Sequence, residues 1–332
     1  MKRLGWLLAV LALFGSALWL AGAVASERLV ASWLQARQAE GWSVARDSID
    51  TTGFPAGFST RIEALQLADP RGGWALVTPW LQLDQQVLHP GRITVTWPER
   101  HVFATGFEEL TITAEHLTTT LAVDLLDNLA LQQSDTRMQA LAIDSSMGWS
   151  AGLDSGQLRF TRQGDSLDYQ LQLDAAGVLP AAPLRALLDP SGQLPELLDR
   201  LHADAVIGFA RAWDLSALEQ ARPAITRIEL AQALAEWGDL AIRVSGALDV
   251  DAMGLPTGSL AIRAQNWRGI LDLAENGGSI SGHLRRTLES ALAVLAGLNG
   301  EPEALDATLT FAEGQLYLGP VPLGPAPRIV LR

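Results

Sequence analysis

Leu167-Asp168-Tyr169-Gln170-Leu171-Gln172-Leu173 is the stretch that decides the fold class of this chain. Apolar and polar residues alternate through it, so an extended backbone directs the apolar side chains to one face and the polar ones to the other. Such alternation is typical of an antiparallel sheet with one dry and one wet face. The turn residues Gln163-Gly164-Asp165 precede the stretch, and Leu158 and Phe160 alternate with polar residues before that turn. The pattern therefore predicts a β-hairpin.

The same alternation recurs on both sides of this hairpin. It predicts strands around Ile93–Trp97, Leu240–Val244 and Leu260–Ile262, and a closing hairpin that turns at Glu313-Gly314. Between them the period changes, and short amphipathic helices are predicted at 183–188, 194–201, 215–221 and 228–237, with a last helix at 285–298. We expect an α+β fold, mostly antiparallel β: a curved or two-lobed amphipathic sheet with a helical insert, preceded by an N-terminal membrane helix.

The predicted regions follow from these changes of period. They are an N-terminal membrane anchor or uncleaved signal (1–25), a connecting helix (26–41), a first β-rich region (42–179), a helical insert (180–238) and a second β-rich region (239–332). The two β-rich regions form either one sheet or two lobes.

The N-terminus indicates a membrane segment. Lys2 and Arg3 form a positive head, and Leu4 to Ala25 contains no charged residue. An apolar helix of about 20 residues spans a hydrocarbon core about 30 Å thick, and the positive head keeps the N-terminus cytoplasmic. We expect a single-pass inner-membrane protein with its body in the periplasm. The alternative is a soluble periplasmic protein after signal cleavage, because Ala23-Val24-Ala25 has the small-x-small pattern of a cleavage site.

Composition excludes several classes of function. The net charge is −13, which repels phosphate backbones and argues against nucleic-acid binding. There are no cysteines, so disulfides and thiolate metal sites are impossible. The single lysine, Lys2, lies ahead of the apolar run, which removes Schiff-base and P-loop chemistry from the body.

Motifs for catalysis are also missing from the sequence. The five histidines show no metal-ligand spacing, and no G-x-S-x-G nucleophile motif occurs. We therefore expect no catalytic residue, no metal site and no cofactor, and hence no enzyme.

The candidate functional site consists of aromatic residues. Five of them are candidates for an apolar groove or a membrane-proximal surface, with core packing as the alternative. They are Phe54, Phe58, Trp74, Trp80 and Trp97. Phe54 and Phe58 flank Pro55-Ala56-Gly57, a loop that either plugs the core beside the N-terminal helix or touches the membrane.

The residues also carry a resemblance. Gly53-Phe54-Pro55, Leu67-Ala68-Asp69-Pro70, Trp97-Pro98 and, at the end, Gly314-Gln315-Leu316 with Pro322-Leu323-Gly324-Pro325 are similar to a family of proteobacterial envelope proteins known only as a domain of unknown function. The resemblance implies an exported protein and no known activity. More distantly, the anchor and the repetitive strands resemble AsmA-like proteins, which hold lipid chains in an apolar groove.

Two functions are therefore expected. The first is an anchored, non-enzymatic periplasmic protein that binds lipid or another apolar envelope component in a groove, with the inner membrane as its partner through Leu4 to Ala25. The alternative is a structural or interaction protein of the envelope that has no small-molecule ligand and whose protein partner the sequence does not name.

Overall fold

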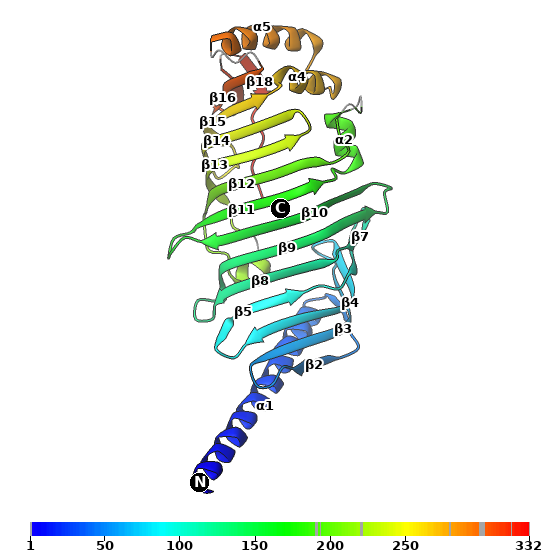
Figure 1. Ribbon diagram of the computed structural model, residues 1–332, viewed down its shortest axis with the longest axis vertical. Helices are drawn as coiled ribbons and strands as arrows, with labels where there is room; N and C mark the ends of the chain where they lie inside the picture. Colours follow the sequence, from blue (N-terminus) through cyan, green and yellow to red (C-terminus); the bar gives the residue numbers. More distant parts are fainter. Residues whose placement is uncertain are drawn as a thin grey trace. The chain divides into compact units, whose positions relative to one another are not determined.

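The computed structural model describes residues 2–189, 192, 194–219, 222–278, 280–298, 303–319 and 321–331 (Figure 1). The fold is mostly antiparallel β, with 56% strand and 18% helix, which confirms the predicted fold class. The chain divides into two compact units. Unit 1 comprises 1–123 and 141–148, and unit 2 comprises 124–140 and 149–332.

Unit 1 begins with one long helix and continues as antiparallel strands. The helix α1 (Lys2–Ala39) is unbroken, so no boundary separates the predicted anchor from the predicted connecting helix. Gly41, with φ +98°, follows its end in the left-handed region that favours glycine. The strands are β1 (Ser43–Ala45), β2 (Ile49–Thr52), β3 (Gly57–Asp69), β4 (Trp74–Gln86), β5 (His89–Thr96), β6 (Arg100–Thr105), β7 (Glu109–Thr113), β8 (His116–Asp124) and the end of β9 (Ala130–Ser145).

Helix α1 packs on unit 1 through the C-terminal half of its length. Leu34 is buried against Ile62, Leu65 and Leu67 of β3, so an apolar stripe on the helix meets the dry side of that strand. The predicted membrane segment, Leu4 to Ala25, lies within α1, and the side chains of residues 4–15 are outside those that the structure describes. Within the described residues, no helix combines the length and the apolarity that a membrane span requires.

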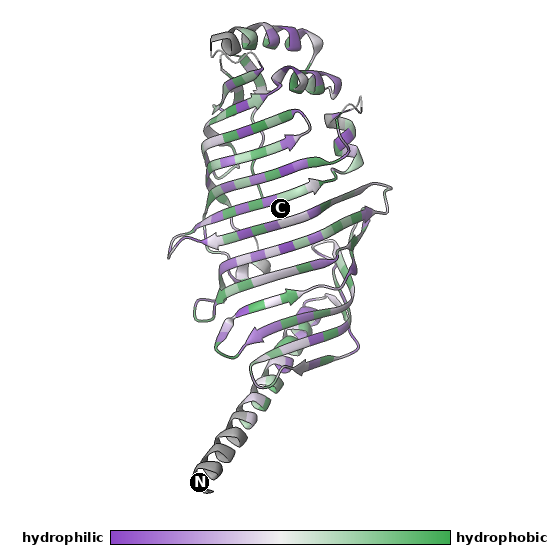
Figure 2. Ribbon diagram, viewed as in Figure 1, coloured by the Kyte–Doolittle hydropathy of each residue, from purple (hydrophilic) through white to green (hydrophobic). Residues whose placement is uncertain are grey.

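Unit 2 is built on a meander in which each strand pairs with the next. The strands are β10 (Ser150–Arg162), β11 (Asp168–Val178), β12 (Leu198–Phe209), β13 (Ile225–Trp237), β14 (Leu240–Val250), β15 (Pro256–Gln265), β16 (Ala304–Ala312), β17 (Gln315–Leu318) and β18 (Val321–Pro325). Every pairing from β10 to β18 is antiparallel. Figure 2 shows hydrophobic and hydrophilic residues alternating along these strands.

The two predicted hairpins are present. Leu158 of β10 lies opposite Leu173 of β11, and the connection passes through Gly164 at φ +57°. Glu313 and Gly314 both have positive φ, +53° and +72°, which is the backbone of a type I′ turn. This turn matches the twist of the flanking strands, and it pairs Ala312 with Gln315.

The helical insert predicted at 180–238 is largely wrong. Among the described residues of this range, the helices are α2 (Ala182–Leu188) and α3 (Leu215–Glu219), and the remaining predicted helices, 194–201 and 228–237, contribute to β12 and β13. Two causes misled the prediction. The segment is rich in Ala, Leu, Glu and Gln, which favour helix, and a register shift between Leu230 and Ala233 interrupts the period-2 alternation. Pairing with neighbours on both sides overrides the local propensity.

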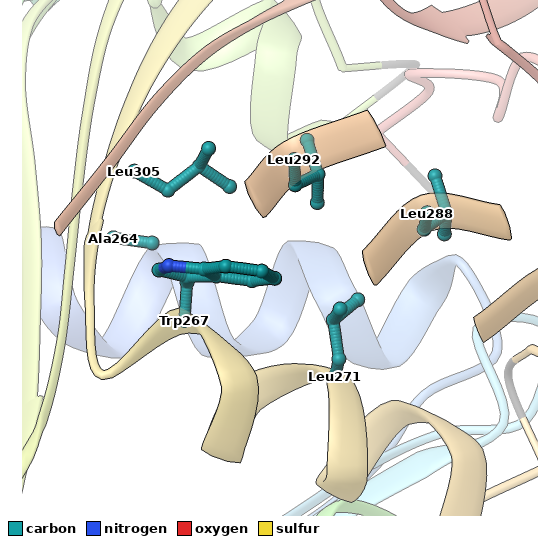
Figure 3. Close-up of a cluster of buried hydrophobic side chains, with 6 residues drawn as sticks. All are labelled: Ala264, Trp267, Leu271, Leu288, Leu292 and Leu305. Atoms are coloured by element: carbon teal, nitrogen blue, oxygen red, sulfur yellow. The ribbon is translucent and has the colours of Figure 1, made fainter. Parts of the chain in front are cut away.

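Two further elements differ from expectation. The stretch 240–250 is the strand β14, which continues past the strand predicted around Leu240–Val244, and 267–276 forms the unpredicted helix α4 (Trp267–Asn276). The predicted last helix is confirmed as α5 (Gly282–Leu298). Helices α4 and α5 enclose an apolar core with the ends of β15 and β16, shown in Figure 3. Its buried members are Ala264, Trp267, Leu271, Leu288, Leu292 and Leu305.

Candidate functional site

The structure does not gather the five predicted aromatic residues into one groove. Phe54 and Phe58 lie against α1, where Trp19 stacks on Phe58 at 5.9 Å between ring centroids and meets the edge of Phe54 at 5.4 Å. The indole Nε1 of Trp19 donates a hydrogen bond to the carbonyl of Gly57, 2.8 Å away. This hydrogen bond fixes the 53–58 loop beside the N-terminal helix, and Phe54 stays 54% exposed.

The three tryptophans have separate surroundings. Trp74 joins a row of rings, with Trp42 edge-on at 5.1 Å and Phe103 stacked at 6.0 Å. The guanidinium of Arg61 lies 4.2 Å from the ring centroid of Trp80, a cation–π contact. Trp97 stacks on the buried ring of His101 at 4.9 Å. These contacts are those of core and surface packing within unit 1.

An apolar surface of another kind runs across the sheet of unit 2. The antiparallel registers align apolar positions from strand to strand: Leu158 faces Leu173, Leu173 faces Ala203, Ala203 faces Ala233, and Ala233 faces Val244. We call the side of the sheet that carries these residues the dry face. Across its middle these side chains are half-buried, apart from Leu158, which is exposed. We define the open stretch of the dry face as Leu158, Leu171, Leu173, Leu201, Ala203, Leu230, Ala233, Ala235, Ile242 and Val244.

One end of the dry face is closed by an aromatic cluster. Tyr169 is fully buried and stacks on Phe160 at 4.6 Å, while Phe209 and Trp213 meet Phe160 edge-on. The Tyr169 hydroxyl donates to the carbonyl of Leu131, 3.1 Å away. Burial raises the pKa of Tyr169, so the phenol is neutral at ordinary pH.

The chain's last described segment covers another part of the dry face. Ile329 packs on a cluster that contains the buried residues Leu248 and Phe311, and its amide donates to the carbonyl of Gly254 at 2.8 Å. Ala326 is buried in the same cluster. We call residues 326–331 the tail.

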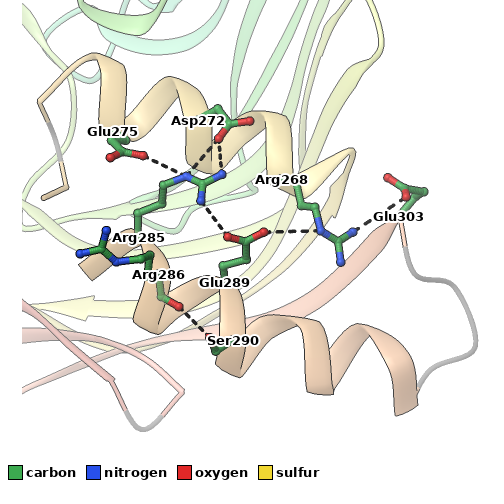
Figure 4. Close-up of polar contacts among 8 residues, drawn as sticks. All are labelled: Arg268, Asp272, Glu275, Arg285, Arg286, Glu289, Ser290 and Glu303. Atoms are coloured by element: carbon green, nitrogen blue, oxygen red, sulfur yellow. Dashed lines mark hydrogen bonds and ion pairs between the residues drawn. The ribbon is translucent and has the colours of Figure 1, made fainter. Parts of the chain in front are cut away.

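Helices α4 and α5 cover the dry face at β15 and β16, and a charged network joins the two helices on their outer side (Figure 4). Arg285 of α5 bonds to Asp272 and Glu275 of α4 and to Glu289 of its own helix. The hydrogen bond with Asp272 is the main cause that raises the pKa of Arg285. Since each of these charges has partners, the network holds the helix pair together and offers no free reactive group.

A cleft of about 380 Å³ is lined by residues of β9, β10, β11 and β12. Arg137, Gln157, Asp174 and Arg200 are among its lining residues. Asp174 accepts a hydrogen bond from His202 Nδ1 at 2.8 Å, and this bond is the main cause that lowers the pKa of Asp174. Arginines and aspartates balance one another around the cleft, which therefore has no strong preference for an ion of either sign. No group of three metal-ligating side chains occurs among the residues that the structure describes.

Comparison with known proteins places the chain in a family. The model of a family of uncharacterized proteins conserved in bacteria, DUF2125, matches residues 19–327. The chain belongs to this family, as its resemblance indicates. No curated protein and no solved structure matches it, and the distant similarity to AsmA-like proteins is not shown by these comparisons.

The open stretch and the aromatic cluster were not singled out as sites from the sequence. The alternation at 158–173 predicts that Leu158, Leu171 and Leu173 share a face. It does not show which parts of that face are covered, because the cover comes from segments distant in sequence. The sequence signal for the Tyr169 cluster was also weak, since Phe209 and Trp213 fall in a region that reads as helical.

Proposed function

We propose that the protein is a membrane-anchored, non-enzymatic protein of the bacterial envelope that holds the acyl chains of lipids on the open stretch of the dry face. The single observation that carries the proposal is the open stretch itself. A sheet face that lies in the interior of a protein is normally covered by a second layer, since each buried methylene contributes about 0.8 kcal/mol. The half-buried residues of the open stretch belong to none of the clusters under the helices or the tail, as far as the described residues go.

The dimensions of the open stretch suit an acyl chain. It crosses the strands from β10 to β14, which are four spacings of about 4.8 Å, or about 19 Å in all. An acyl chain in one leaflet of a bilayer spans about 15 Å. Small side chains at Ala203, Ala233 and Ala235 lie along the middle of this path, where a chain could contact the sheet closely.

The anchor is the second part of the proposal. Leu4 to Ala25 is uncharged behind Lys2 and Arg3, which supports a single-pass segment with the body on the periplasmic side. An anchored body stays near the membrane that supplies lipid. No residue of the open stretch is polar, which supports binding without catalysis.

The amount of lipid bound to the purified protein tests the proposal directly. The full-length protein, extracted in mild detergent, is examined by native mass spectrometry for bound lipid. Leu173→Arg and Leu201→Arg each place a charge on the open stretch, and we expect bound lipid to fall about tenfold, equivalent to about 1.4 kcal/mol. Leu126→Arg is the control, because Leu126 is 98% exposed in the turn after β8 and is not part of the open stretch.

Thermal unfolding of each variant separates loss of lipid from loss of fold. A wild-type protein that carries no lipid, or open-stretch variants that retain as much lipid as Leu126→Arg, would contradict the proposal. That result would favour the alternative, a structural or interaction protein of the envelope without a small-molecule ligand.

A further inference from the structure

Two loops of unit 1 meet beside α1. The first is Gly53–Gly57 and the second is the turn 86–89 between β4 and β5. The amide of Val87 donates to the carbonyl of Ala56, 3.4 Å away. At Gly57 a Cβ atom would lie 2.7 Å from the carbonyl oxygen of Gln85, so the two backbones are in close contact there. The loops therefore form one structural feature.

This feature is apolar and exposed. Leu88 is 86% exposed, Phe54 54% and Val87 45%, and on the adjoining helix Leu20 is 60% exposed. We call these four residues the apolar tip. Residues 51–60 and 85–91 contain no Asp, Glu, Lys or Arg, although 18% of the chain is charged. Large apolar side chains that are exposed together in segments without charge are typical of a surface that contacts a membrane or another protein.

The position of the tip along α1 indicates what it contacts. Trp19 bonds to Gly57, and a Cβ atom at Gly22 would lie 2.5 Å from the ring of Phe58, so the loop is seated on α1 at Trp19–Gly22. Trp19 is 15 residues after Leu4, the first residue of the uncharged run. At about 1.5 Å per residue this distance is about 22 Å, whereas the hydrocarbon core is about 30 Å thick.

The uncharged run continues past the tip. Ala25 ends it, and Glu27 is the first charged residue after it. If Leu4 marks one edge of the hydrocarbon, the other edge lies about 8 Å beyond Trp19, a depth typical of apolar groups that insert at a membrane interface. Trp19, with its ring against the loop, suits this interfacial level as well.

We infer that the apolar tip, Leu20, Phe54, Val87 and Leu88, inserts into the membrane leaflet farther from Lys2 and Arg3. This inference rests on the anchoring proposed above. The occupant of this surface is lipid hydrocarbon, and the contact is apolar rather than electrostatic. It holds unit 1 at a set height on the bilayer, because the loops and α1 enter the membrane together.

The absence of cysteine allows a clean test. Leu88→Cys in the full chain is labelled with a nitroxide, and the protein is reconstituted into phosphatidylethanolamine–phosphatidylglycerol nanodiscs. Collision rates with oxygen and with a water-soluble nickel chelate report depth. Phe107→Cys is the matched control: Phe107 is 94% exposed in unit 1, and its turn follows Thr105, which pairs with Trp74 at the opposite end of β4. A nitroxide on Leu11→Cys reports whether the predicted anchor lies in the bilayer.

We expect the labels at residues 11 and 88 to collide preferentially with oxygen, and the label at residue 107 with the nickel chelate. If the label at residue 88 collides mainly with the nickel chelate, as the label at residue 107 should, while the label at residue 11 lies in the bilayer, the apolar tip does not insert. That result would contradict the inference about the tip and leave the proposed anchor intact. Water exposure at residue 11 would overturn the anchoring itself. Because the tip is uncharged, the depth of the label at residue 88 in the bilayer should not change when phosphatidylglycerol is omitted or salt is raised. A depth that depended on either would contradict an apolar contact.

Discussion

The open stretch and the Tyr169 cluster occupy the same face of the same sheet, yet they differ in burial. Both arise from alternating apolar residues on β10, β11 and β12. At the Tyr169 end, Phe209 meets Tyr169 edge-on, Trp213 beyond the end of β12 meets Phe209 edge-on, and Tyr169 is fully buried. Across the open stretch, Leu173 and Ala203 keep part of their surface exposed. Alternation decides which side of a strand is apolar, and the chain that returns over that side decides whether it becomes core.

The largest effect should come from removing the centre of the covered end. Tyr169→Ala deletes a buried ring that contacts Phe160 and Phe209, and we expect the free energy of unfolding to fall by about 3–5 kcal/mol. Urea unfolding followed by tryptophan fluorescence measures it. A loss below about 1 kcal/mol would mean that this end is no better packed than the open stretch.

Two leucines compare covered with open positions directly. Leu292→Ala removes a buried side chain of α5 and should lower the free energy of unfolding by about 2–5 kcal/mol. Leu173→Ala removes a half-exposed side chain from the open stretch and should cost about 1 kcal/mol, because less apolar surface is lost. Equal losses in paired urea titrations would show that the open stretch is covered in solution.

A smaller effect should follow from Tyr169→Phe. Without the hydroxyl, the Leu131 carbonyl loses its hydrogen bond, which should lower the free energy of unfolding by about 0.5–1.5 kcal/mol.

The Tyr169→Phe variant also tests the pH dependence of stability. Burial raises the pKa of Tyr169 above its ordinary value of 10.0, so above that pH the unfolded chain loses a proton that the folded chain retains. Stability should therefore decrease as pH rises past 10.0, and this decrease should be shallower in Tyr169→Phe.

The smallest change in stability is expected at the exposed edge of the open stretch. Leu158 is 37% exposed, and Leu158→Ala should alter the free energy of unfolding by no more than about 0.5 kcal/mol. Bound lipid should nevertheless decrease, because the side chain is available to a ligand. A variant that loses stability without losing lipid would reverse the roles assigned to the two regions.

Sequence reasoning predicted the strands where alternation was regular, as at 167–173, and the hairpin at Glu313-Gly314. It failed at 228–237, where a bulge removed the period and helix-favouring residues supplied a false signal. The physical reason is that strand pairing is non-local, so Ala233 is held by neighbours on β12 and β14 that its own sequence does not indicate.

The candidate site was less predictable than the fold. Phe54 and Phe58 lie beside the N-terminal helix, which their loop follows closely in sequence. Trp74, Trp80 and Trp97 lie elsewhere in unit 1. The sequence could not predict this, because the presence of an aromatic residue does not indicate which side chains it contacts. Val87 and Leu88 were not singled out from the sequence. The pairing of β3 with β4 and the hydrogen bond from Val87 to Ala56 bring their turn to the loop that carries Phe54.

The path of the tail has a practical consequence for experiments with fusion proteins. Ile329 is held against the dry face, and Val330 and Leu331 beyond it are partly exposed. A purification tag or fluorescent protein appended at the C-terminus would therefore begin beside that face, where it could compete with whatever binds there. An insertion between Leu125 and Leu126 is the alternative, because this exposed turn contains no residue of the open stretch.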